Sequence, residues 1–375
     1  MKILHLITRM DRGGSAVNTL LSGIEQCKLG HVVTLAYGPS LESEMSAAEC
    51  AKVDAELQIF TALGGRVIIL PSMLRSLGWH DWAAFDEIRD MLREGFDVLH
   101  THTSKAGALG RLAARDSGIA IVHTPHGHIF HGYFGMLKTK TFIAIERILA
   151  RQTSALIALT YAERADHLAL LIGKPEQWRV IPSGVDVQSI AQAVMVSNEA
   201  SDADKQWDAV SVGRLVPIKG MERLLLAWHE VCKHKPNAKL ALLGDGEERP
   251  RLESMLDDLG LCENVYFAGW ADPIPYLASA RCFALLSHNE GMGRAVVEAF
   301  AAGLPCVVSD VCGLRELVEP SVGRVVDADE PRQVAAALLT AWHESVPAAA
   351  RKRAEDYSVA TMMRGLEKVY AEVQV

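Results

Sequence analysis

The sequence predicts an α/β protein made of two successive units, each an open parallel sheet with helices. Short apolar runs rich in β-branched residues alternate with longer amphipathic segments, which is typical of repeated βαβ units. The alternation runs through the first half of the chain and restarts near residue 209. The chain has 375 residues, 49% hydrophobic and 22% charged, which is enough apolar material for two buried cores.

The first half supplies the elements of one sheet. Its strands are expected at Lys2–Ile7, Val32–Ala36, Arg66–Leu70, Val98–Thr101, Ile119–His123 and Ala155–Leu159. Amphipathic helices are expected between them, at Ala16–Cys27, Trp82–Glu94, Ala106–Ser117 and Thr141–Arg151.

The second half repeats this arrangement. Its strands are expected at Ala209–Val212, Leu240–Leu243, Val265–Phe267, Cys282–Leu286 and Cys306–Val308. Helices are expected at Met221–Lys233 and, at the end of the chain, at Val359–Val373.

The boundary between the units is predicted from a polar stretch. Residues Ala191–Gln206 show little apolar periodicity, which is typical of an exposed connector. We therefore expect an N-terminal domain over residues 1–187, a linker over 188–206 and a C-terminal domain over 207–357. By its apolar pattern the final helix could pack on either domain, and we assign residues 358–375 to the first.

Charge and composition exclude several classes of protein. The net charge is −8, and residues 1–180 carry 19 basic and 18 acidic side chains, so the acidity lies in the rear half. Nucleic acid is not an expected partner, whereas the front half could touch an anionic acceptor or the lipid headgroups of the inner membrane face. The apolar start at Met1–Ile7 is too short for a signal peptide, and no run approaches about 20 apolar residues. The seven cysteines form no C-x-x-C pair, and we expect a cytoplasmic protein.

The strongest candidate site follows the strand that ends near Leu286. A glycine-containing turn, Glu290–Gly293, leads into a helix that begins near Arg294. Ligands bind at the carboxyl ends of strands in open parallel sheets, and helix N-terminal amides bind anions, so this turn is a candidate ligand contact. Glu298 lies about one turn into the helix on a face expected to be core, where a ligand hydroxyl could satisfy it. The alternative is that Glu290 and Glu298 are ordinary solvated glutamates.

Two basic residues follow the first strand of the second half. Arg214 and Lys219 lie on one loop, which also contains Gly213, Pro217 and Gly220. Cations held in this way can converge on a diphosphate and neutralise the charge of a leaving group. The alternative is that both are exposed, solvated side chains.

Glycines mark three further strand ends. Gly13 and Gly14 stand where the first strand leads into a helix, so their amides could face a phosphate, although the pair is no G-x-G-x-x-G fingerprint. Gly244 ends another strand, and the stretch Ala268–Trp270 ends a third. Both could line a nucleotide pocket, and each could equally be only a turn.

Histidines and other polar residues follow two strands of the first half. The segment His123–Tyr133 is rich in histidine but lacks cysteine and carboxylate ligands, so we expect no metal. We expect His126 to hydrogen-bond a polar ligand, while its neighbours shape an acceptor loop. Ser104 could instead simply cap the helix that follows it. The acceptor-side candidates are His102, Ser104, Lys105, His128, His131 and Tyr133.

Together these motifs resemble those of the retaining glycosyltransferase family 4, which has the GT-B fold. The most specific element is Glu290–Glu298, which is similar to the Glu-x7-Glu motif of the family and is followed by Ala-Phe-Ala-Ala-Gly-Leu-Pro. Arg214 and Lys219 resemble the family's diphosphate-binding pair, and Ile181–Asp186 resembles its interdomain turn. The resemblance implies two Rossmann-like domains that face each other across a cleft.

The resemblance also implies a role for each candidate residue. Arg214 and Lys219 would hold the donor diphosphate, helped by the Gly13-Gly14 loop, and Glu298 would hold the ribose. Glu290 would bind the donor sugar, and His126 would contact the same sugar. The catalytic candidates are Glu290, His126, Arg214 and Lys219. The donor-binding candidates are Gly13, Gly14, Arg214, Lys219, Gly244, Ala268, Gly269, Trp270, Glu290, Gly291, Met292, Gly293, Arg294 and Glu298.

The implied reaction moves a hexose or N-acetylhexosamine from a nucleotide-sugar, a UDP-sugar, to a glycan or lipid-linked acceptor, with retained configuration. No metal and no cofactor are expected, because fixed cations would replace the metal. The stretch His102–Arg111 and the His126-Gly127 turn look like family members that build surface polysaccharides or lipid-linked oligosaccharides. Met292 stands where an aromatic residue is common in the family, and Arg294 where a small apolar residue is common. These departures concern the identity of the donor sugar, and Arg294 could contact an anionic sugar.

Two other functions fit the same residues. A nucleotide-sugar epimerase of similar architecture would convert the donor without an acceptor. A non-catalytic nucleotide-sugar-binding protein would bind the donor and form no product. Product analysis with donor alone distinguishes the first alternative, and titration with donor identifies the second.

Overall fold

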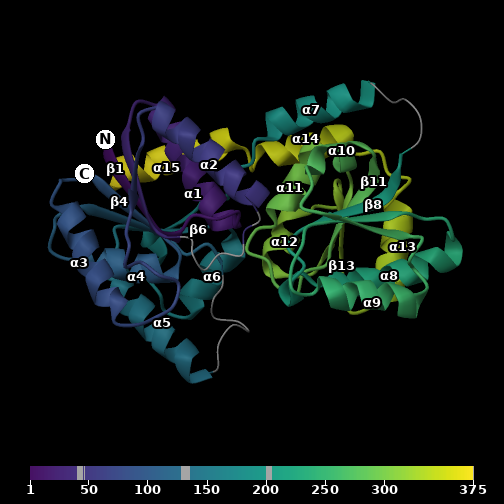
Figure 1. Cartoon of the computed structure of the whole chain (residues 1–375), viewed down its shortest axis with the longest axis horizontal. Coiled ribbons are helices and arrows are strands. Elements are labelled where there is room, and N and C mark those ends of the chain that lie inside the picture. Colours follow the sequence, from purple (N-terminus) through teal and green to yellow (C-terminus); the bar gives the residue numbers. More distant parts are fainter. Residues whose placement is uncertain (40–44, 46, 128–135, 200–204, 375) are drawn as a thin grey trace. The chain divides into compact units, whose positions relative to one another are not determined.

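The computed structural model describes residues 1–39, 45, 47–127, 136–199 and 205–374. The chain divides into two compact units (Figure 1). The first comprises Met1–Gly184 and Met362–Val375, and the second comprises Val185–Thr361. None of the helices in the described parts of the chain is long and apolar enough to cross a membrane.

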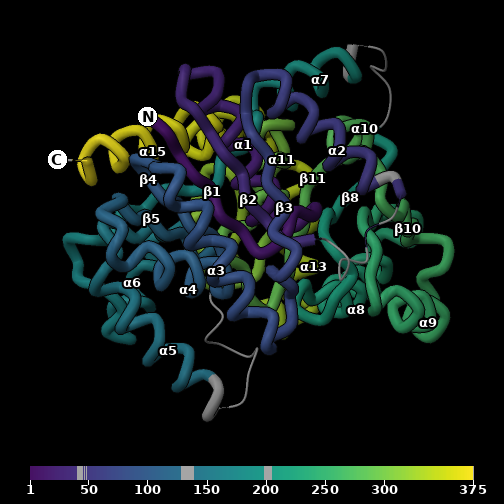
Figure 2. Tube along the Cα trace, turned by 60° about the vertical axis from the view of Figure 1, so that its left-hand side comes forward, coloured from purple at the N-terminus to yellow at the C-terminus, as the bar shows by residue number. Residues whose placement is uncertain are grey.

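The first unit is a seven-stranded parallel sheet with the order β3-β2-β1-β4-β5-β6-β7. Figure 2 shows β1, β2 and β3 side by side. The strands are β1 (Lys2–Arg9), β2 (Val32–Gly38), β3 (Arg66–Ile69), β4 (Val98–His102), β5 (Ala120–Thr124), β6 (Ala155–Ala158) and β7 (Trp178–Val180). The helices are α1 (Gly14–Lys28), α2 (Ala47–Ala62), α3 (His80–Leu92), α4 (Ser104–Ala113), α5 (Met136–Ala150), α6 (Tyr161–Ala169) and a 3-10 turn at Pro175–Gln177.

Strand β1 is buried on both faces, as expected for the centre of a parallel sheet with helices on each side. Successive side chains of a strand point to opposite faces. Leu4 and Leu6 therefore join a core with α3 and α4, whereas Ile7 joins a separate core with α1 and α2. Helices thus cover both faces of the sheet, and polar residues of β1 and β4 are buried.

The second unit is a six-stranded parallel sheet with the order β10-β9-β8-β11-β12-β13, which is the order of the first six strands in the first unit. The strands are β8 (Trp207–Val212), β9 (Leu240–Leu243), β10 (Val265–Gly269), β11 (Ala280–Leu285), β12 (Cys306–Ser309) and β13 (Gly323–Val326). The helices are α7 (Val187–Glu199), α8 (Met221–His234), α9 (Arg249–Leu259), α10 (Pro273–Ala278), α11 (Arg294–Ala301), α12 (Cys312–Leu317), α13 (Pro331–Ala341), α14 (Pro347–Glu355) and a 3-10 turn at Pro217–Lys219.

The core of the second unit is centred on α8. Its apolar face, which includes Leu224, Leu225 and the fully buried Trp228, packs with strands β8 and β9 and with Val334 and Leu338 of α13. This packing fixes the start of α8, and with it the loop between β8 and α8 that carries the basic candidates.

The last helix, α15 (Val359–Val373), groups with the first unit from Met362 onward. Its buried face includes Met362, Leu366 and Tyr370. The amide Nε2 of Gln26 in α1 donates to the hydroxyl of Tyr370 at 3.3 Å. The final helix therefore completes the interior of the first unit.

The predicted elements are confirmed, with one correction between the units. Every strand and helix expected from the sequence overlaps an observed one, and β7 and β13 are additional strands. The expected linker at 188–206 is instead helical as far as Glu199, because α7 belongs to the second unit. Val187 and Val194 are buried at helical spacing, with Ile190 half-buried between them. The periodicity was missed because it begins before the polar stretch.

Candidate functional site

Four strands of the second unit end at one edge of its sheet, and each is followed by candidate residues. The pairings are parallel, with Val212 opposite Leu243 and Leu243 opposite Gly269. Strand β11 pairs with β8 in the same direction. The structure thus gathers at this edge the loop 213–219, Gly244, the stretch 268–270 and the turn 287–293.

An ion pair joins two of these loops. The ammonium Nζ of Lys219 lies 2.6 Å from Oε2 of Glu290, and the hydroxyl of Ser287 donates to the same oxygen at 3.1 Å. The two charged side chains retain 23% and 13% of their exposure, so the pair is shielded but open to a ligand. A backbone bond from the amide of His288 to the carbonyl of Ile218, 2.9 Å long, holds the loops together. The predicted neighbourhood of Lys219 and Glu290 is therefore present.

Arg214 lies on the same loop, and its side chain is exposed. The next residue, Leu215, is fully buried, and its amide donates to the carbonyl of Asp245 at 2.9 Å. The backbone around Arg214 is therefore anchored while its guanidinium stays accessible. An exposed guanidinium on an anchored backbone is accessible to an anionic ligand.

Two candidate glycines are required by the backbone. Gly244 has a φ of +130°, and a Cβ at this position would lie 2.0 Å from the carbonyl oxygen of Gly213. Gly293 has a φ of +81° and precedes the first residue of α11. Only glycine adopts such conformations without strain, so both turns bring backbone close to the candidate edge.

Candidate residues in α11 and in the turn before it differ in burial. Met292 is buried, whereas Arg294 and Glu298 are half-buried. Glu298 is thus less buried than the residues that form the core face of α11. That face contains Val296, Val297, Ala299, Phe300 and Ala301.

The stretch Ala268–Trp270 ends β10 beside Gly244. The amide of Gly244 donates to the carbonyl of Gly269 at 2.8 Å, and Ala268 is half-buried. Trp270 keeps 45% of its surface exposed. An indole exposed at this edge is available to stack on a planar ring.

The Gly13-Gly14 loop of the first unit has an internal partner. The amide of Gly13 donates to Oδ1 of Asp11 at 2.8 Å, and the other carboxylate oxygen of Asp11 pairs with Arg9 at 2.6 Å. A phosphate bound by the Gly13 amide would have to displace this carboxylate. Sequence reasoning did not anticipate the competition, although Asp11 is adjacent to the loop.

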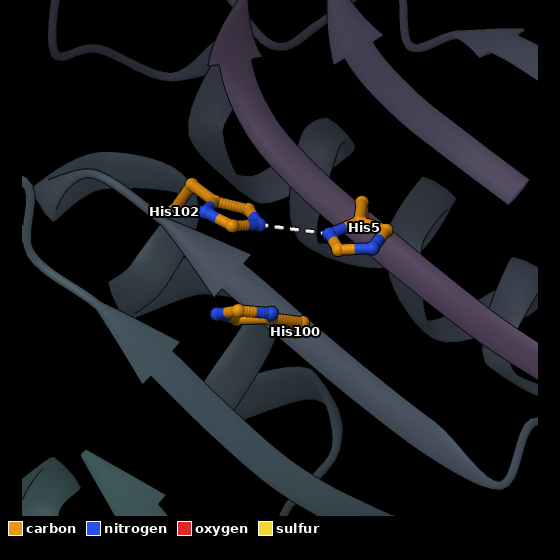
Figure 3. A group of neighbouring side chains, drawn as sticks. All are labelled: His5, His100 and His102. Atoms are coloured by element: carbon orange, nitrogen blue, oxygen red, sulfur yellow. Dashed lines mark hydrogen bonds between the residues drawn. The ribbon is translucent and has the colours of Figure 1, made fainter. Parts of the chain in front are cut away.

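A line of hydrogen-bonded histidines crosses the sheet of the first unit. Nδ1 of His5 in β1 lies 2.9 Å from Nε2 of His102 in β4 (Figure 3), and Nδ1 of His102 lies 2.9 Å from Nε2 of His126. At the other end, Nε2 of His5 donates to Oε1 of Gln26 at 2.6 Å. Burial lowers the pKa of His5 to about 4 and holds the pKa of His102 well below its usual value. These imidazoles are therefore neutral at physiological pH.

His100 forms a second branch beside this line. Its Nδ1 lies 2.6 Å from the hydroxyl of Tyr370, and its Nε2 lies 2.8 Å from the hydroxyl of Thr124. The rings of His100 and His102 are 4.1 Å apart, centroid to centroid. Burial also holds the pKa of His100 well below its usual value.

The backbone of His126 is held in an uncommon conformation. His126 has a φ of +62°, a region that side chains other than glycine rarely enter. The next amide, of Gly127, donates to Oε1 of Glu163 at 2.9 Å, and the amide of Leu159 donates to Oε2 at 2.6 Å. Burial raises the pKa of Glu163 to about 7, although both backbone bonds oppose the shift. Glu163 thus clamps the turn that carries His126.

The acceptor-side candidates differ in burial and in the partners of their side chains. His102 is buried with both ring nitrogens bonded to histidines, so a direct contact with an acceptor, as expected from the sequence, is wrong. Ser104 is the first residue of α4, which the Ser104 side chain does not cap. The ammonium of Lys105 pairs with Asp81 at 2.5 Å. His128, His131 and Tyr133 lie outside the described residues.

Sequence reasoning missed four residues that shape the site of the first unit. These are His5, Gln26, Glu163 and Tyr370. One signal was present, because His100 and His102 are two residues apart on a strand and must share a face. Polar residues on the face of a buried strand require partners, and these partners come from distant segments.

Models of known families match almost the whole chain. Residues 12–189 match Glycosyltransferase Family 4, and residues 197–358 match Glycosyl transferases group 1. The two matches coincide with the two Rossmann-like units described above.

Individual proteins give the same result. The Escherichia coli UDP-Gal:alpha-D-GlcNAc-diphosphoundecaprenol alpha-1,3-galactosyltransferase is 31% identical over 268 residues, 68% of this chain and 68% of that protein. The putative glycosyltransferase EpsF of Bacillus subtilis is 26% identical over 93% of this chain and 88% of its own length. The structure of Anabaena Alr3699/HepE in complex with UDP, 21% identical, covers 99% of this chain and 100% of that chain with a TM-score of 0.80. The two Rossmann-like domains of the GT-B class are thereby confirmed, and the chain belongs to Glycosyltransferase Family 4.

Proposed function

We propose that this glycosyltransferase moves a hexose or N-acetylhexosamine from a UDP-sugar to a glycan or lipid-linked acceptor, with retained configuration and without a metal or cofactor. The observation that carries the proposal is the ion pair of Lys219 and Glu290 at one edge of the second sheet, on a loop that also contains Arg214. A basic pair next to a carboxylate suits a sugar diphosphate, which carries negative charge on one side and hydroxyls on the other.

The charges of this edge explain how the bond to the leaving group would break. Negative charge grows on the diphosphate as the sugar departs, and Arg214 and Lys219 would neutralise it. Lys219 has three donors, so it can keep its bond to Glu290 while it binds a phosphate oxygen. Retention follows if a leaving phosphate oxygen takes the acceptor proton on the same face of the sugar. The cations would then do the work that a metal does in other transferases.

The donor base and ribose have candidate partners at the same edge. The Escherichia coli relative is named for UDP-Gal, which supports a uridine nucleotide here. Trp270, which is exposed, would stack on the base, and Glu298 would accept hydrogen bonds from ribose hydroxyls. Arg294, at the start of α11, would then lie near the donor sugar.

The acceptor side is proposed for the first unit. The same relative is named for a diphosphoundecaprenol acceptor, which supports a lipid-linked acceptor and a role in surface polysaccharide synthesis. Trp79 and Trp82 of the first unit are exposed over 89% and 71% of their surface. Indoles favour the membrane interface, so these two support peripheral contact of a cytoplasmic enzyme with the inner membrane face. Nucleic acid is not a proposed partner.

The proposal is tested with a panel of UDP-sugars and a diphosphoundecaprenol-linked N-acetylhexosamine acceptor. We expect UDP release that depends on acceptor, persists in EDTA, and yields a product whose anomeric configuration, measured by NMR, matches the donor. Conversion of donor without acceptor would support an epimerase instead. Donor binding with no product from any acceptor would support a non-catalytic binding protein.

Variants of the basic pair test its role. Arg214→Ala and Lys219→Ala are each expected to lower kcat by about 10²–10³, because each removes stabilisation of the leaving group. Lys233→Ala is the matched control, since Lys233 is an exposed lysine of the same unit paired with Glu230. Circular dichroism verifies that all variants fold. Unchanged kcat in both site variants would contradict the assignment.

A further inference from the structure

Two segments of the second unit are joined twice by pairs of acidic and basic side chains. The first segment is the loop after β8 with the start of α8, and the second is the turn after β11. Lys219 of the first segment pairs with Glu290 of the second at 2.6 Å. Glu222 of the first segment lies with its Oε1 2.7 Å from Nε2 of His288 in the second. The acid and the base therefore exchange segments between the two links.

The second link, His288–Glu222, forms whatever the charge on the imidazole. An ionised carboxylate only accepts hydrogen bonds, so Nε2 of His288 carries the hydrogen that points to Glu222. Both the charged ring and one neutral tautomer have this hydrogen. The side chains of His288 and Glu222 keep 42% and 20% of their exposure, so the link lies near the surface and has a modest energy.

His288 holds the first segment on both sides of Lys219. Its backbone amide donates to the carbonyl of Ile218 at 2.9 Å, and its side chain reaches Glu222. Ile218 precedes Lys219 in the sequence, and Glu222 follows it in the first turn of α8. A single bond would leave the two segments free to pivot, whereas two bonds from one residue fix their orientation.

The backbone of the turn is fixed as far as residue 288. Gly220 has a φ of +60°, and a Cβ there would collide with the carbonyl oxygen of Leu286, so the two segments are in contact at this point. The hydroxyl of Ser309, at the end of β12, donates to the carbonyl of Ser287 at 2.7 Å. Glu290 lies only two residues beyond this fixed part of the turn. Its position therefore depends on how firmly residue 288 is held.

A bound donor would weaken the first link and leave the second unchanged. In the proposed function a phosphate oxygen binds Lys219 and a sugar hydroxyl binds Glu290, so each member of that pair gains a competing partner. Neither His288 nor Glu222 is among the residues proposed to hold the donor. The His288–Glu222 link therefore keeps its strength when the donor is bound.

We propose that His288 and Glu222 are positioning residues that hold Glu290 in place for the donor sugar while the diphosphate occupies Lys219. The inference rests on the proposed function, and all of these residues belong to the second unit. UDP engages the basic residues but lacks the sugar that Glu290 binds. Loss of the link should therefore weaken recognition of the sugar and leave the affinity for UDP intact.

The test is calorimetric titration with UDP, UDP-galactose and UDP-N-acetylglucosamine, each without acceptor. Glu222→Ala and His288→Ala should each lower the affinity for the better-bound sugar nucleotide about fivefold and change the affinity for UDP by less than about twofold. Glu222→Gln keeps an acceptor for Nε2–H and should restore most of the loss. A merely structural role would lower the affinity for UDP equally, because Lys219 lies on the same segment, and that result would overturn the proposal.

Glu230→Ala is the matched control. Glu230 lies on the same helix, pairs with Lys233 at 2.7 Å and keeps the same 20% of its side-chain exposure as Glu222. This variant should bind all three ligands as the unaltered protein does.

A double variant shows whether the two residues act through one link. Glu222→Ala combined with His288→Ala should lose about as much affinity as either change alone. A loss of about 25-fold, the product of two independent effects, would overturn the proposal. If the unaltered protein does not bind UDP, the proposed function itself fails. If it binds UDP and the sugar nucleotides but the variants do not separate them, only this inference fails.

Discussion

At the scale of single residues, the candidate site depends on how far each charge is withdrawn from water. The pairs Lys219–Glu290 and Lys233–Glu230 have nearly equal lengths, 2.6 and 2.7 Å. The lysine of the second pair is 50% exposed, and such surface pairs contribute about 0–1 kcal/mol. Lys219 and Glu290 are better shielded and come from different loops, so their pairing orders two segments as well as two charges.

The carboxylate of Glu163 gives a prediction with a defined sign. Its pKa of about 7 lies above the value of 4.5 for an unperturbed glutamate, so its contribution to stability is full below pH 4.5 and is lost as pH rises through 7. Glutamine does not titrate. The destabilisation caused by Glu163→Gln should therefore be about 2–3 kcal/mol larger at pH 5 than at pH 8 in urea unfolding. Glu176→Gln, at an exposed position, is the control. An equal loss at both pH values would contradict the raised pKa.

At the scale of elements, the turns that follow the strands of the second unit include glycine positions at which there is no room for a Cβ atom. Gly244 gives the sharpest prediction, because a Cβ there would collide with the carbonyl of Gly213, next to Arg214. Gly244→Ala should weaken binding of UDP, measured by calorimetry, at least about tenfold as this loop shifts. Gly260→Ala is the matched control, since Gly260 also has a positive φ, +67°, but open space around it. That control should cost about 1–2 kcal/mol of stability and leave UDP affinity intact.

The sequence predicted the elements better than the contacts between them. Eleven strands were expected because each is a compact apolar run, whereas β7 and β13 are short and include Arg179 and Arg324. The loop motifs around Lys219 and Glu290 were predicted because each follows its own strand. The line of hydrogen bonds that joins Gln26, His5, His102 and His126 was not predicted. These residues lie on α1, β1, β4 and the loop after β5, and they meet only after the sheet has formed.

At the scale of the whole molecule, buried neutral histidines make stability depend on pH. Burial lowers the pKa of five of them, His5, His100, His102, His123 and His167. Their contribution is present above pH 6.5 and is lost as pH falls toward 4, because the unfolded chain then binds protons that the native chain refuses.

We therefore expect the free energy of unfolding to fall between pH 6.5 and 4. His5 alone accounts for about 3 kcal/mol, from a pKa lowered from 6.5 to about 4. Glu163 opposes the trend, but it is one carboxyl group against five imidazoles. Urea unfolding followed at half-unit pH intervals measures the slope. A free energy that stays level or rises across this window would show that the histidines are charged in the native state.

The placement of α15 has a consequence for synthesis. All seven strands of the first unit precede α15 in the sequence, so the ribosome has made the whole sheet well before it makes Tyr370. Until then Gln26 and His100 lack the hydroxyl that joins them, and the first unit lacks the buried face of α15 with Met362 and Leu366. Synthesis of the first unit thus begins before that of the second and is completed only after it.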